Sequence, residues 1–302
     1  MKKKLIIYPS WEERSSKGFL RDYSEHPFSE VLLIRNSMNH CELFEEQLTQ
    51  IENICKEKSI KIHYVDICND SIKNWQALND AIEIGIGTND QVILDITTMS
   101  RNIVWSILYF LRVKIKEVSI VYHQPNVYTD KWISREPGQP RLLFKHSGIY
   151  DLSKEITLLL ITGFDEERTR YILQKYEPKR VYLLVQTGEQ FNNFNRNNVD
   201  VHRKICREFG MYEDDIVSQM IDAYSADLGY STIESIVRSE ENSNIILASF
   251  GPKPSAVAAY RCYMQHPEIA LCYLPCKDYN IDYCQGIGES VSYTLDFPDE
   301  QD

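Results

Sequence analysis

The chain has 302 residues, a hydrophobic fraction of 43% and a formal net charge of -11, with an isoelectric point of about 5.2. Its length allows two domains of ordinary size. Proteins that bind long DNA or RNA are normally basic, because their affinity comes from neutralising phosphates. The acidic total therefore excludes general nucleic-acid binding, but it does not exclude a small nucleotide in one basic pocket.

Other whole-chain features point to a cytoplasmic protein. The eight cysteines contain no C-x-x-C pair, so we expect reduced thiols and no structural zinc site. The seven histidines show no H-x-x-x-H or H-E-x-x-H spacing, which argues against a zinc enzyme. The apolar run after Lys4 is too short for a signal peptide, and no segment has the length of a membrane span. We expect no metal, no cofactor and no membrane contact.

In the first half of the chain, short apolar runs alternate with segments of helical length. Such alternation is typical of a mainly parallel sheet covered by helices. Strands are predicted at 5–8, 31–35, 61–66, 92–95 and 118–122, and helices from 14 to about 23 and at 41–58, 74–84 and 102–111.

The segment 128–150 interrupts this pattern with several prolines and glycines, and we interpret it as a loop or hairpin leading to a boundary. The pattern then restarts. Strands are predicted at 156–161, 180–186, 244–249 and 269–274, a strand or short helix at 216–222, and helices from 168 to about 176 and at 198–209, 230–239 and 256–265. The strand at 269–274 is expected to close the series.

The two halves resemble each other at an offset of about 150 residues, as expected for a whole-domain duplication. The matches occur in the same order: 8–14 with 162–168, 93–101 with 246–255, and 121–128 with 272–279. We therefore predict two tandem Rossmann-like α/β domains, residues 1–152 and 153–302, each with a mainly parallel sheet flanked by helices.

The strongest functional pattern follows the fourth predicted strand. Asp95 ends that strand, the hydroxyl-rich turn contains Thr97, Thr98 and Ser100, and Arg101 opens an apolar helix. A helix N-terminus after such a turn attracts anions, because backbone N–H groups point outward and the helix dipole favours negative charge. Arg101 adds a fork of donors suited to phosphate. The alternative is that Asp95 only caps the next helix, with Thr97 or Ser100 as the N-cap.

The spacing from Asp95 through Thr97 to Arg101 resembles the [DN]-x-[ST]-x-x-x-[KR] motif of CARF domains, the Rossmann-like sensor domains of CRISPR-associated proteins. In that family the motif also follows the fourth strand. The resemblance covers the N-terminal half and, weakly, the C-terminal half. It implies binding of a cyclic oligoadenylate or related nucleotide signal in antiviral defence, with cleavage of the ligand in some members.

The C-terminal copy of this turn departs from the motif. Ala248 stands in the place of the acid, so Lys253 and Ser255 must supply the polar groups. Gly251 allows close approach of a ligand to the backbone, and Pro254 suits the first turn of the next helix. The spacing is not that of a Walker A loop. A rigid packing turn with a solvated lysine is the alternative.

Two acid-rich loops follow the first strand of each half. Ser10 and Arg14 belong to the first loop, and Arg168 closes the second. Both arginines are expected at the sheet edge where ligands of open α/β folds bind. The neighbouring acids divide acid and base roles, hold a metal or a ribose hydroxyl, or only cap the next helix and pair charges. They are Glu12, Glu13, Asp165, Glu166 and Glu167.

The loop after the strand at 180–186 is rich in amides. Gln186 and the following segment to Asn198 combine hydrogen-bonding amides with Phe191, Phe194 and Arg196, which suit base edges, base stacking and phosphate. Its counterpart in the first half is 35–40. An ordinary polar loop is the alternative.

These patterns favour a fused pseudo-dimer that recognises a nucleotide or nucleotide-derived signal. No effector domain is evident after Leu295, so the output is expected to pass through a partner protein or through self-assembly. An enzyme that cleaves or transfers a nucleotide in the same crevice is the first alternative. A scaffold subunit of a defence complex is the second, because a fold alone never establishes a function.

Overall fold

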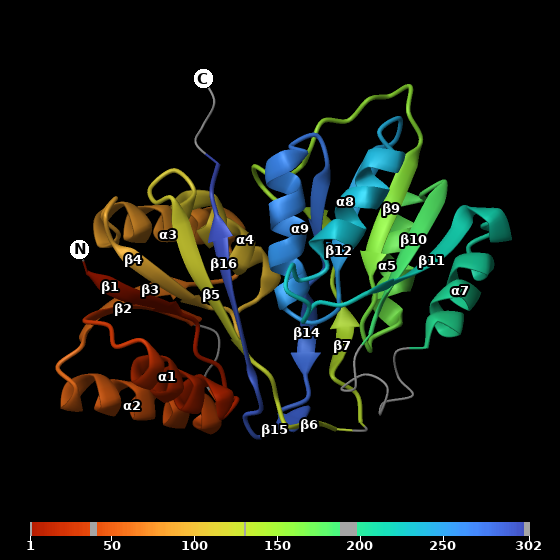
Figure 1. Ribbon diagram of the computed structural model, residues 1–302. Coiled ribbons are helices and arrows are strands. Elements are labelled where there is room, and N and C mark those ends of the chain that lie inside the picture. The colour runs from red at the N-terminus through yellow and green to blue at the C-terminus, as the bar shows by residue number, and fades with distance from the viewer. Residues whose placement is uncertain (1, 37–40, 130, 188–197, 299–302) are drawn as a thin grey trace. The chain divides into compact units, whose positions relative to one another are not determined.

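The computed structural model describes residues 2–36, 41–129, 131–187 and 198–298 and divides into two compact units (Figure 1). Unit 1 comprises Met1–Thr129 together with Cys284–Asp302, and unit 2 comprises Asp130–Tyr283. This division differs from the expected boundary at 152/153. The chain leaves unit 1 earlier, and its last segment returns there.

Unit 1 contains a six-stranded sheet in the order β16-β5-β4-β1-β2-β3. All neighbouring pairs are parallel except β16 with β5. Helices α1 and α2 cover one face of the sheet, and α3 and α4 cover the other (Figure 1). The strands are β1 (Lys3–Ile7), β2 (Glu30–Asn36), β3 (Lys61–Ile67), β4 (Gln91–Asp95), β5 (Glu117–His123) and β16 (Ser290–Asp296), and the helices are α1 (Arg14–Glu25), α2 (Glu42–Glu57), α3 (Ser71–Gly85) and α4 (Arg101–Leu111).

Unit 2 has a six-stranded sheet in the order β11-β10-β9-β12-β13-β8. Its only antiparallel pair among the described strands of this sheet is β13 with β8. The strands are β8 (Arg141–Leu142), β9 (Ile156–Ile161), β10 (Arg180–Gln186), β11 (Ile216–Ile221), β12 (Asn244–Ser249) and β13 (Ala270–Tyr273), and the helices are α5 (Glu167–Tyr176), α7 (Val199–Glu208), α8 (Tyr230–Ser239) and α9 (Pro254–Gln265), with a short 3-10 turn at Glu213–Asp215.

The two sheets have the same topology. Numbered within its own half, each runs 3-2-1-4-5 in parallel and ends in one antiparallel edge strand. This order defines a doubly wound, Rossmann-like arrangement. The prediction of two tandem α/β units produced by internal duplication is therefore confirmed, strand for strand.

The edge strand of each sheet comes from the other half of the sequence. After β5 the chain forms β6 (Val127–Tyr128) in unit 1, and it then forms β7 (Ser134–Pro137) and β8 in unit 2, where β8 pairs with β13. After β13 it forms β14 (Cys276–Tyr279), then β15 (Cys284–Gln285), and β16 pairs with β5. The intermediate strands are exchanged in the same way, because β7 pairs with β14 and β15 pairs with β6.

Two expectations fail at this exchange. The strand series does not close at 269–274, because β14, β15 and β16 follow. The segment 128–150, expected to be a loop or a hairpin, is neither a loop throughout nor a hairpin, because it contains β7 and β8, which pair with β14 and β13 rather than with each other. Their partners lie more than 100 residues away along the chain, so local sequence carries no signal of the pairing.

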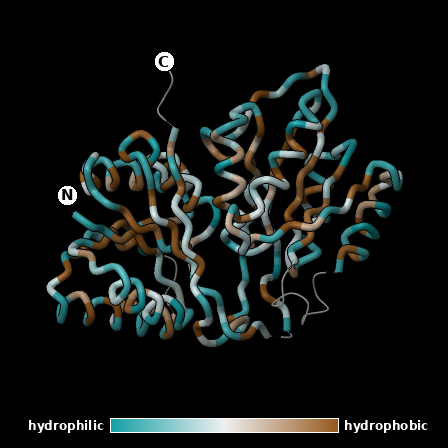
Figure 2. Tube along the Cα trace, in the orientation of Figure 1, coloured by the Kyte–Doolittle hydropathy of each residue, from teal (hydrophilic) through white to brown (hydrophobic). Residues whose placement is uncertain are grey.

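Buried apolar side chains lie on both faces of each sheet, and the strands are largely hydrophobic along their length (Figure 2). Strands of a parallel sheet covered by helices on both faces are apolar throughout rather than alternating. The run Leu158–Ile161 is fully buried, as are Leu5 and Ile6 of β1. Among the described residues, no helix combines the length and apolar character needed to cross a membrane.

Candidate functional site

The predicted site residues lie near the switch point of each sheet, where the strand order reverses. In unit 1 the chain proceeds from β1 to β2 on one side, whereas β4 leads to β5 on the other. The loops after β1 and β4 therefore diverge at the carboxyl edge, which is where ligands of open α/β sheets bind. The loops after β9 and β12 diverge in the same way in unit 2.

In unit 1 the two switch-point loops contact each other. The Thr98 hydroxyl donates to the backbone oxygen of Tyr8. Ser10 is buried, its N–H donates to Ser15 Oγ at 2.9 Å, and its hydroxyl accepts from the Glu12 N–H at 3.2 Å. These contacts fix the shape of the loop after β1 rather than presenting Ser10 to solvent.

Arg14 forms a buried ion pair. Its side chain is 2% exposed, and Nε donates to Glu12 Oε2 at 2.9 Å. Nη1 donates to the His123 backbone oxygen at 2.8 Å, which joins α1 to the end of β5. Glu13 instead pairs with Lys17 on the surface, and the hydrogen bond from Lys17 lowers the pKa of Glu13. In unit 1 these acids thus serve charge pairing.

Asp95 and Thr97 point into unit 1. Both side chains are buried, Asp95 Oδ1 accepts from the Thr97 N–H at 2.8 Å, and Thr97 Oγ1 accepts from the His123 N–H at 2.9 Å. Asp22, which sequence reasoning did not single out, lies beside Asp95. Burial raises the pKa of Asp22 to about 7, and the Asp95 carboxylate adds to this shift, whereas the hydrogen bond with His123 opposes it.

The rest of the motif lies closer to solvent. Thr98, Ser100 and Arg101 are half-buried, and α4 begins at Arg101. Ser100 occupies the N-cap position, but its side chain makes no capping hydrogen bond. The uncapped first turn and the adjacent guanidinium retain the character expected of an anion site.

The unit 2 counterpart is built differently. The register pairs Ile7 with Asp95 in unit 1 and Ile161 with Ser249 in unit 2, so Ser249, rather than Ala248, takes the place of Asp95. Ser249 Oγ lies 2.7 Å from Ser255 Oγ, which is fully buried.

Two further predicted residues lie in this loop of unit 2. A Cβ at Gly251 would lie 2.9 Å from Ile161 Cγ2, so packing alone accounts for this glycine. Lys253 is half-buried at the N-cap of α9 and supplies the positive charge there.

The Gln186 side chain forms hydrogen bonds within unit 2. Its Oε1 accepts from the Ala223 N–H at 3.0 Å, and its Nε2 donates to Asp222 Oδ1 at 3.2 Å. It therefore ties β10 to the segment after β11. The proposed contacts of Phe191, Phe194 and Arg196 lie outside the described residues, as do positions 37–40 of the counterpart loop.

Arg168 borders a cavity of about 810 Å³ at the carboxyl edge of unit 2. Its Nη2 donates to Ser134 Oγ at 2.7 Å, and its Nε lies 3.6 Å from Asp165 Oδ2. Ser134 in turn donates to Asp165. The cavity is lined by Lys131, Trp132, Ser134, Arg135, Glu136, Pro137, Phe164, Asp165, Glu166, Glu167, Arg168, Tyr171, Asn198, Val201, His202 and Cys276.

Aromatic and charged groups meet in this cavity. The Arg135 guanidinium lies 4.1 Å from the ring centroid of Trp132. His202 is buried, its Nδ1 lies 2.9 Å from Thr169 Oγ1, and burial lowers its pKa, so the imidazole is neutral at neutral pH. Of the predicted binding residues, only Arg168 lines the cavity. Trp132 and the basic residues of 128–150 were evident in the sequence. The sequence did not show that they line one cavity together with the loop after β9.

The fold and these switch-point loops define a duplicated protein of the doubly wound, Rossmann-like class. No protein-family model matches the chain, and no curated protein matches it. Similar solved structures include a universal stress protein from Archaeoglobus fulgidus, 9% identical, covering 92% of this chain and 97% of that one with a TM-score of 0.28. The cytoplasmic domain of a prokaryotic cation chloride cotransporter is 11% identical. The match covers 93% of this chain and 98% of that domain, also with a TM-score of 0.28.

Proposed function

We propose that the chain recognises a nucleotide or nucleotide-derived signal and that the unit 2 cavity is its principal binding site. One observation carries this proposal: a cavity of about 810 Å³ combines aromatic faces with charged groups at the carboxyl edge of a doubly wound sheet. Ligand pockets for small molecules span about 300–1,000 Å³. Such sheets bind their ligands at this edge.

The side chains suit the parts of a nucleotide. Trp132 and Tyr171 offer faces on which a base can stack, worth about 1–3 kcal/mol per base. Arg135 presents a planar fork for phosphate oxygens. Glu166 and Glu167 can accept hydrogen bonds from ribose hydroxyls.

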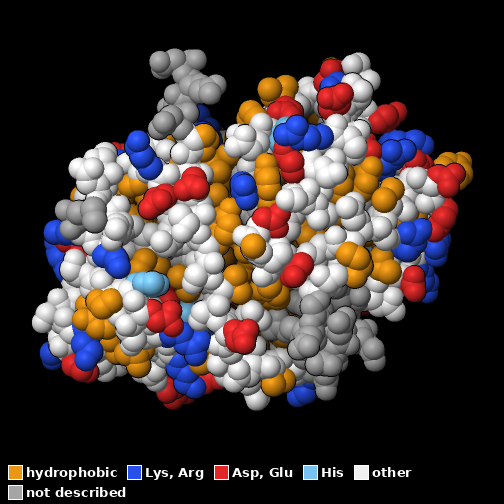
Figure 3. All heavy atoms as spheres, in the orientation of Figure 1, with side chains coloured by type: hydrophobic (Ala, Val, Ile, Leu, Met, Phe, Trp, Pro, Cys, Tyr) orange, Lys and Arg blue, Asp and Glu red, His pale blue; other side chains and the backbone are white. Residues whose placement is uncertain are grey.

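The charge of the cavity lining limits the class of ligand that can bind. Its lining carries three basic and four acidic side chains, namely Lys131, Arg135 and Arg168 against Glu136, Asp165, Glu166 and Glu167. A polyphosphate would meet a net negative lining, so a nucleoside or a ligand with few phosphates is favoured. On the face shown in Figure 3, acidic and basic side chains are interspersed, as suits a protein with no long nucleic acid as partner.

The switch-point loops offer a second place for anionic groups. Arg101 at the start of α4 and Lys253 at the start of α9 each place a cation beside a helix N-terminus. The role in antiviral defence, and output through a partner protein, rest on the resemblance of the Asp95–Arg101 motif alone.

The test is equilibrium binding of nucleosides and of linear and cyclic nucleotides to the full chain. Trp132→Ala should weaken binding by about 1–3 kcal/mol if a base stacks on this ring. Arg101→Ala should cost about 1.5–3 kcal/mol if phosphate binds at α4, the range for a hydrogen bond to a charged group.

Matched controls remove a cation from the same helices outside the two sites. Arg170→Ala removes an exposed ion pair between Arg170 on α5 and Glu208. Arg112→Ala removes a cation at the C-terminal end of α4, away from Arg101. Both should bind as the unmodified chain does. Absence of binding across the whole panel would overturn the proposal and favour the scaffold alternative.

A nucleotide-cleaving enzyme is the second candidate. The observation that favours it is the pair of carboxylates, Glu166 and Glu167, in the same cavity as the neutral imidazole of His202, since such groups can divide acid and base roles. A single-turnover assay with excess protein distinguishes the two. Cleavage faster than about one per second, a typical lower bound for enzymes, would show that the chain is an enzyme rather than a sensor.

A further inference from the structure

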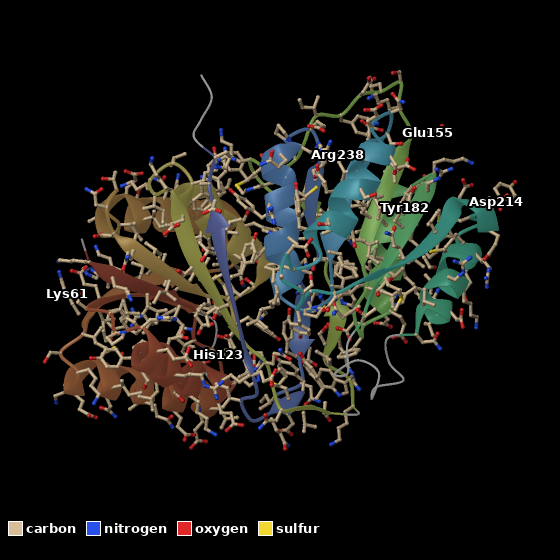
Figure 4. The ribbon with its side chains drawn as sticks, viewed as in Figure 1. Lys61, His123, Glu155, Tyr182, Asp214 and Arg238 are labelled. Carbon is tan, nitrogen blue, oxygen red and sulfur yellow. The ribbon has the colours of Figure 1, made fainter. Side chains whose placement is uncertain are left out.

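Three buried side chains from different elements of unit 1 converge at the carboxyl edge of its sheet. Asp22 lies on α1, Asp95 ends β4, and His123, labelled in Figure 4, ends β5. One potential metal-ligand atom from each lies within 4.8 Å of those of the other two. None of the three side chains is more than 1% exposed, so water does not compete for them.

Two oxygens in this cluster have no hydrogen-bond partner in the described part of the chain. Asp95 uses Oδ1 to accept from the Thr97 N–H, which leaves Oδ2 without a partner among the described residues. Asp22 Oδ1 lies 3.0 Å from His123 Nε2, and its Oδ2 is likewise without a partner there. Leaving a buried carboxylate oxygen unsatisfied is costly. A cation held between the carboxylates would satisfy both oxygens.

The histidine is oriented as metal-bound histidines are. Its Nδ1 lies 2.8 Å from Ser290 Oγ, and Arg21 Nη1 donates to the same hydroxyl at 3.1 Å. Metal-ligating imidazoles commonly use their other ring nitrogen in this way, which fixes the tautomer and the ring plane. Space for the ring comes from Gly18 on α1, where a Cβ would lie 2.6 Å from His123 Cδ2.

We propose that Asp22, Asp95 and His123 bind one divalent transition-metal ion, such as Zn²⁺. Bonds from such an ion to imidazole nitrogen and carboxylate oxygen are about 2.0–2.2 Å long, so ligand atoms lie about 3.0 Å apart at the right angles of an octahedral site and about 3.4 Å apart at the tetrahedral angles usual for Zn²⁺. The distance of 3.0 Å between Asp22 Oδ1 and His123 Nε2 matches that value. The other two separations are at most 4.8 Å, so the side chains have to move closer together when the ion binds.

The donor set narrows the class of ion. One imidazole with two carboxylates suits Zn²⁺, Mn²⁺ or Fe²⁺, whereas Ca²⁺ and Mg²⁺ prefer oxygen ligands alone. The free Oδ2 atoms of Asp22 and Asp95 allow either carboxylate to chelate and so raise the coordination number. Because the side chains are closed off from solvent, the ion has a structural rather than a catalytic role.

The ion would connect three elements around the motif. Asp95 starts the turn that contains Thr97 and leads to Arg101, so a bound ion would hold this turn against α1 and β5. Unit 2 has Ser249 in the place of Asp95, and among the described residues no second cluster of this kind occurs. One ion per chain is therefore expected.

The test uses the full chain and begins with the metal content of the purified protein. The protein is then dialysed against a chelator and titrated with ZnCl₂ against a chromophoric competitor, and in parallel with MnCl₂, Fe²⁺ under nitrogen, and CoCl₂. We expect saturable binding of one ion per chain, with a rise in melting temperature. If none of these ions binds at or near one per chain, the proposal is overturned and a proton shared between the carboxylates takes its place.

Variants locate the ion if binding is found. Asp22→Asn and Asp95→Asn keep the size of each side chain, and each should weaken binding at least tenfold. Ser290→Ala should weaken it by about 10–100-fold, the range for partners of a metal-bound imidazole. The control is Glu240→Gln, a buried acid of unit 2, which should leave affinity unchanged. Unchanged affinity in both aspartate variants would overturn the assignment. If those variants fail to fold, binding by the unmodified chain decides.

Discussion

Gly18 on α1 offers a direct test of the packing around His123. A Cβ added at Gly18 would lie 2.6 Å from His123 Cδ2 and 3.1 Å from Nε2. The ring cannot move away freely, because Nδ1 is held at Ser290 and Nε2 at Asp22. The substitution Gly18→Ala must therefore displace either the helix or this hydrogen-bonded ring.

The magnitude follows from two opposing terms. Overpacking a core by one methyl group costs about 1–3 kcal/mol. Replacing glycine by alanine in a helix interior stabilises the folded chain by about 0.5–1 kcal/mol, because the unfolded chain loses backbone entropy. We expect Gly18→Ala to lower the free energy of unfolding by about 1–2 kcal/mol in total.

Urea denaturation of the full chain, followed by far-UV circular dichroism and by tryptophan fluorescence, measures this change. Gly85→Ala on α3 is the matched control in the same unit, because its Cβ would meet only Leu32 Cδ1 at 3.7 Å, an ordinary contact. The control should be neutral or more stable. A Gly18→Ala protein as stable as the unmodified chain would refute the packing argument.

Two further predictions concern charged groups of unit 1. Arg14→Met should destabilise the chain by about 3–5 kcal/mol, because it leaves the Glu12 carboxylate buried without its partner, and the double variant Glu12→Gln with Arg14→Met should recover part of that loss in the same denaturation experiment. The hydrogen bond from Lys2, aided by Lys4, lowers the pKa of Glu30 to about 2. Its contribution to stability is therefore complete above the ordinary carboxyl pKa of about 4.3 and is lost as the pH falls towards 2. Glu30→Gln should flatten the dependence of the melting temperature on pH between 5 and 2, and an unchanged slope would contradict the assignment.

The sequence predicted the parallel strands well because burial on both faces makes them continuous apolar runs. Residues 92–94 and 158–161 are of this kind, and the structure places both in central strands. Strand β16 was missed although its alternation of polar and apolar residues is typical of a strand. What local sequence could not show is its pairing, because its partner β5 begins 173 residues earlier, at Glu117 against Ser290. The division into units depends on such long-range pairings, so composition alone could not reveal it.

The switch-point loop after β4 was predicted in place, but the inward orientation of Asp95 was not. The spacing from Asp95 to Arg101 identified the switch-point loop correctly, yet Asp95 points inward, because Asp22 and His123 surround its carboxylate. No spacing rule could have joined these residues, since 73 residues separate Asp22 from Asp95. The unit 2 cavity was missed for the same reason, because Trp132 and Arg168 meet only after the chain has exchanged strands.

The exchanged edge strands mean that neither half of the gene encodes a self-sufficient protein. A fragment ending at residue 152 would carry β8 without the sheet it completes, and it would leave β5 without β16. An open parallel edge of this kind invites association with another chain. Two such fragments, produced separately, should regain complete sheets only when mixed.

The ancestral single-copy protein would have faced the same requirement. Each copy would have lent its last strand to a second copy, which makes an obligate dimer the simplest state before duplication. Fusion of two such copies would turn an exchange between molecules into one within a single chain. It would also leave the two copies able to differ, as they do at the positions of Asp95 and Ser249.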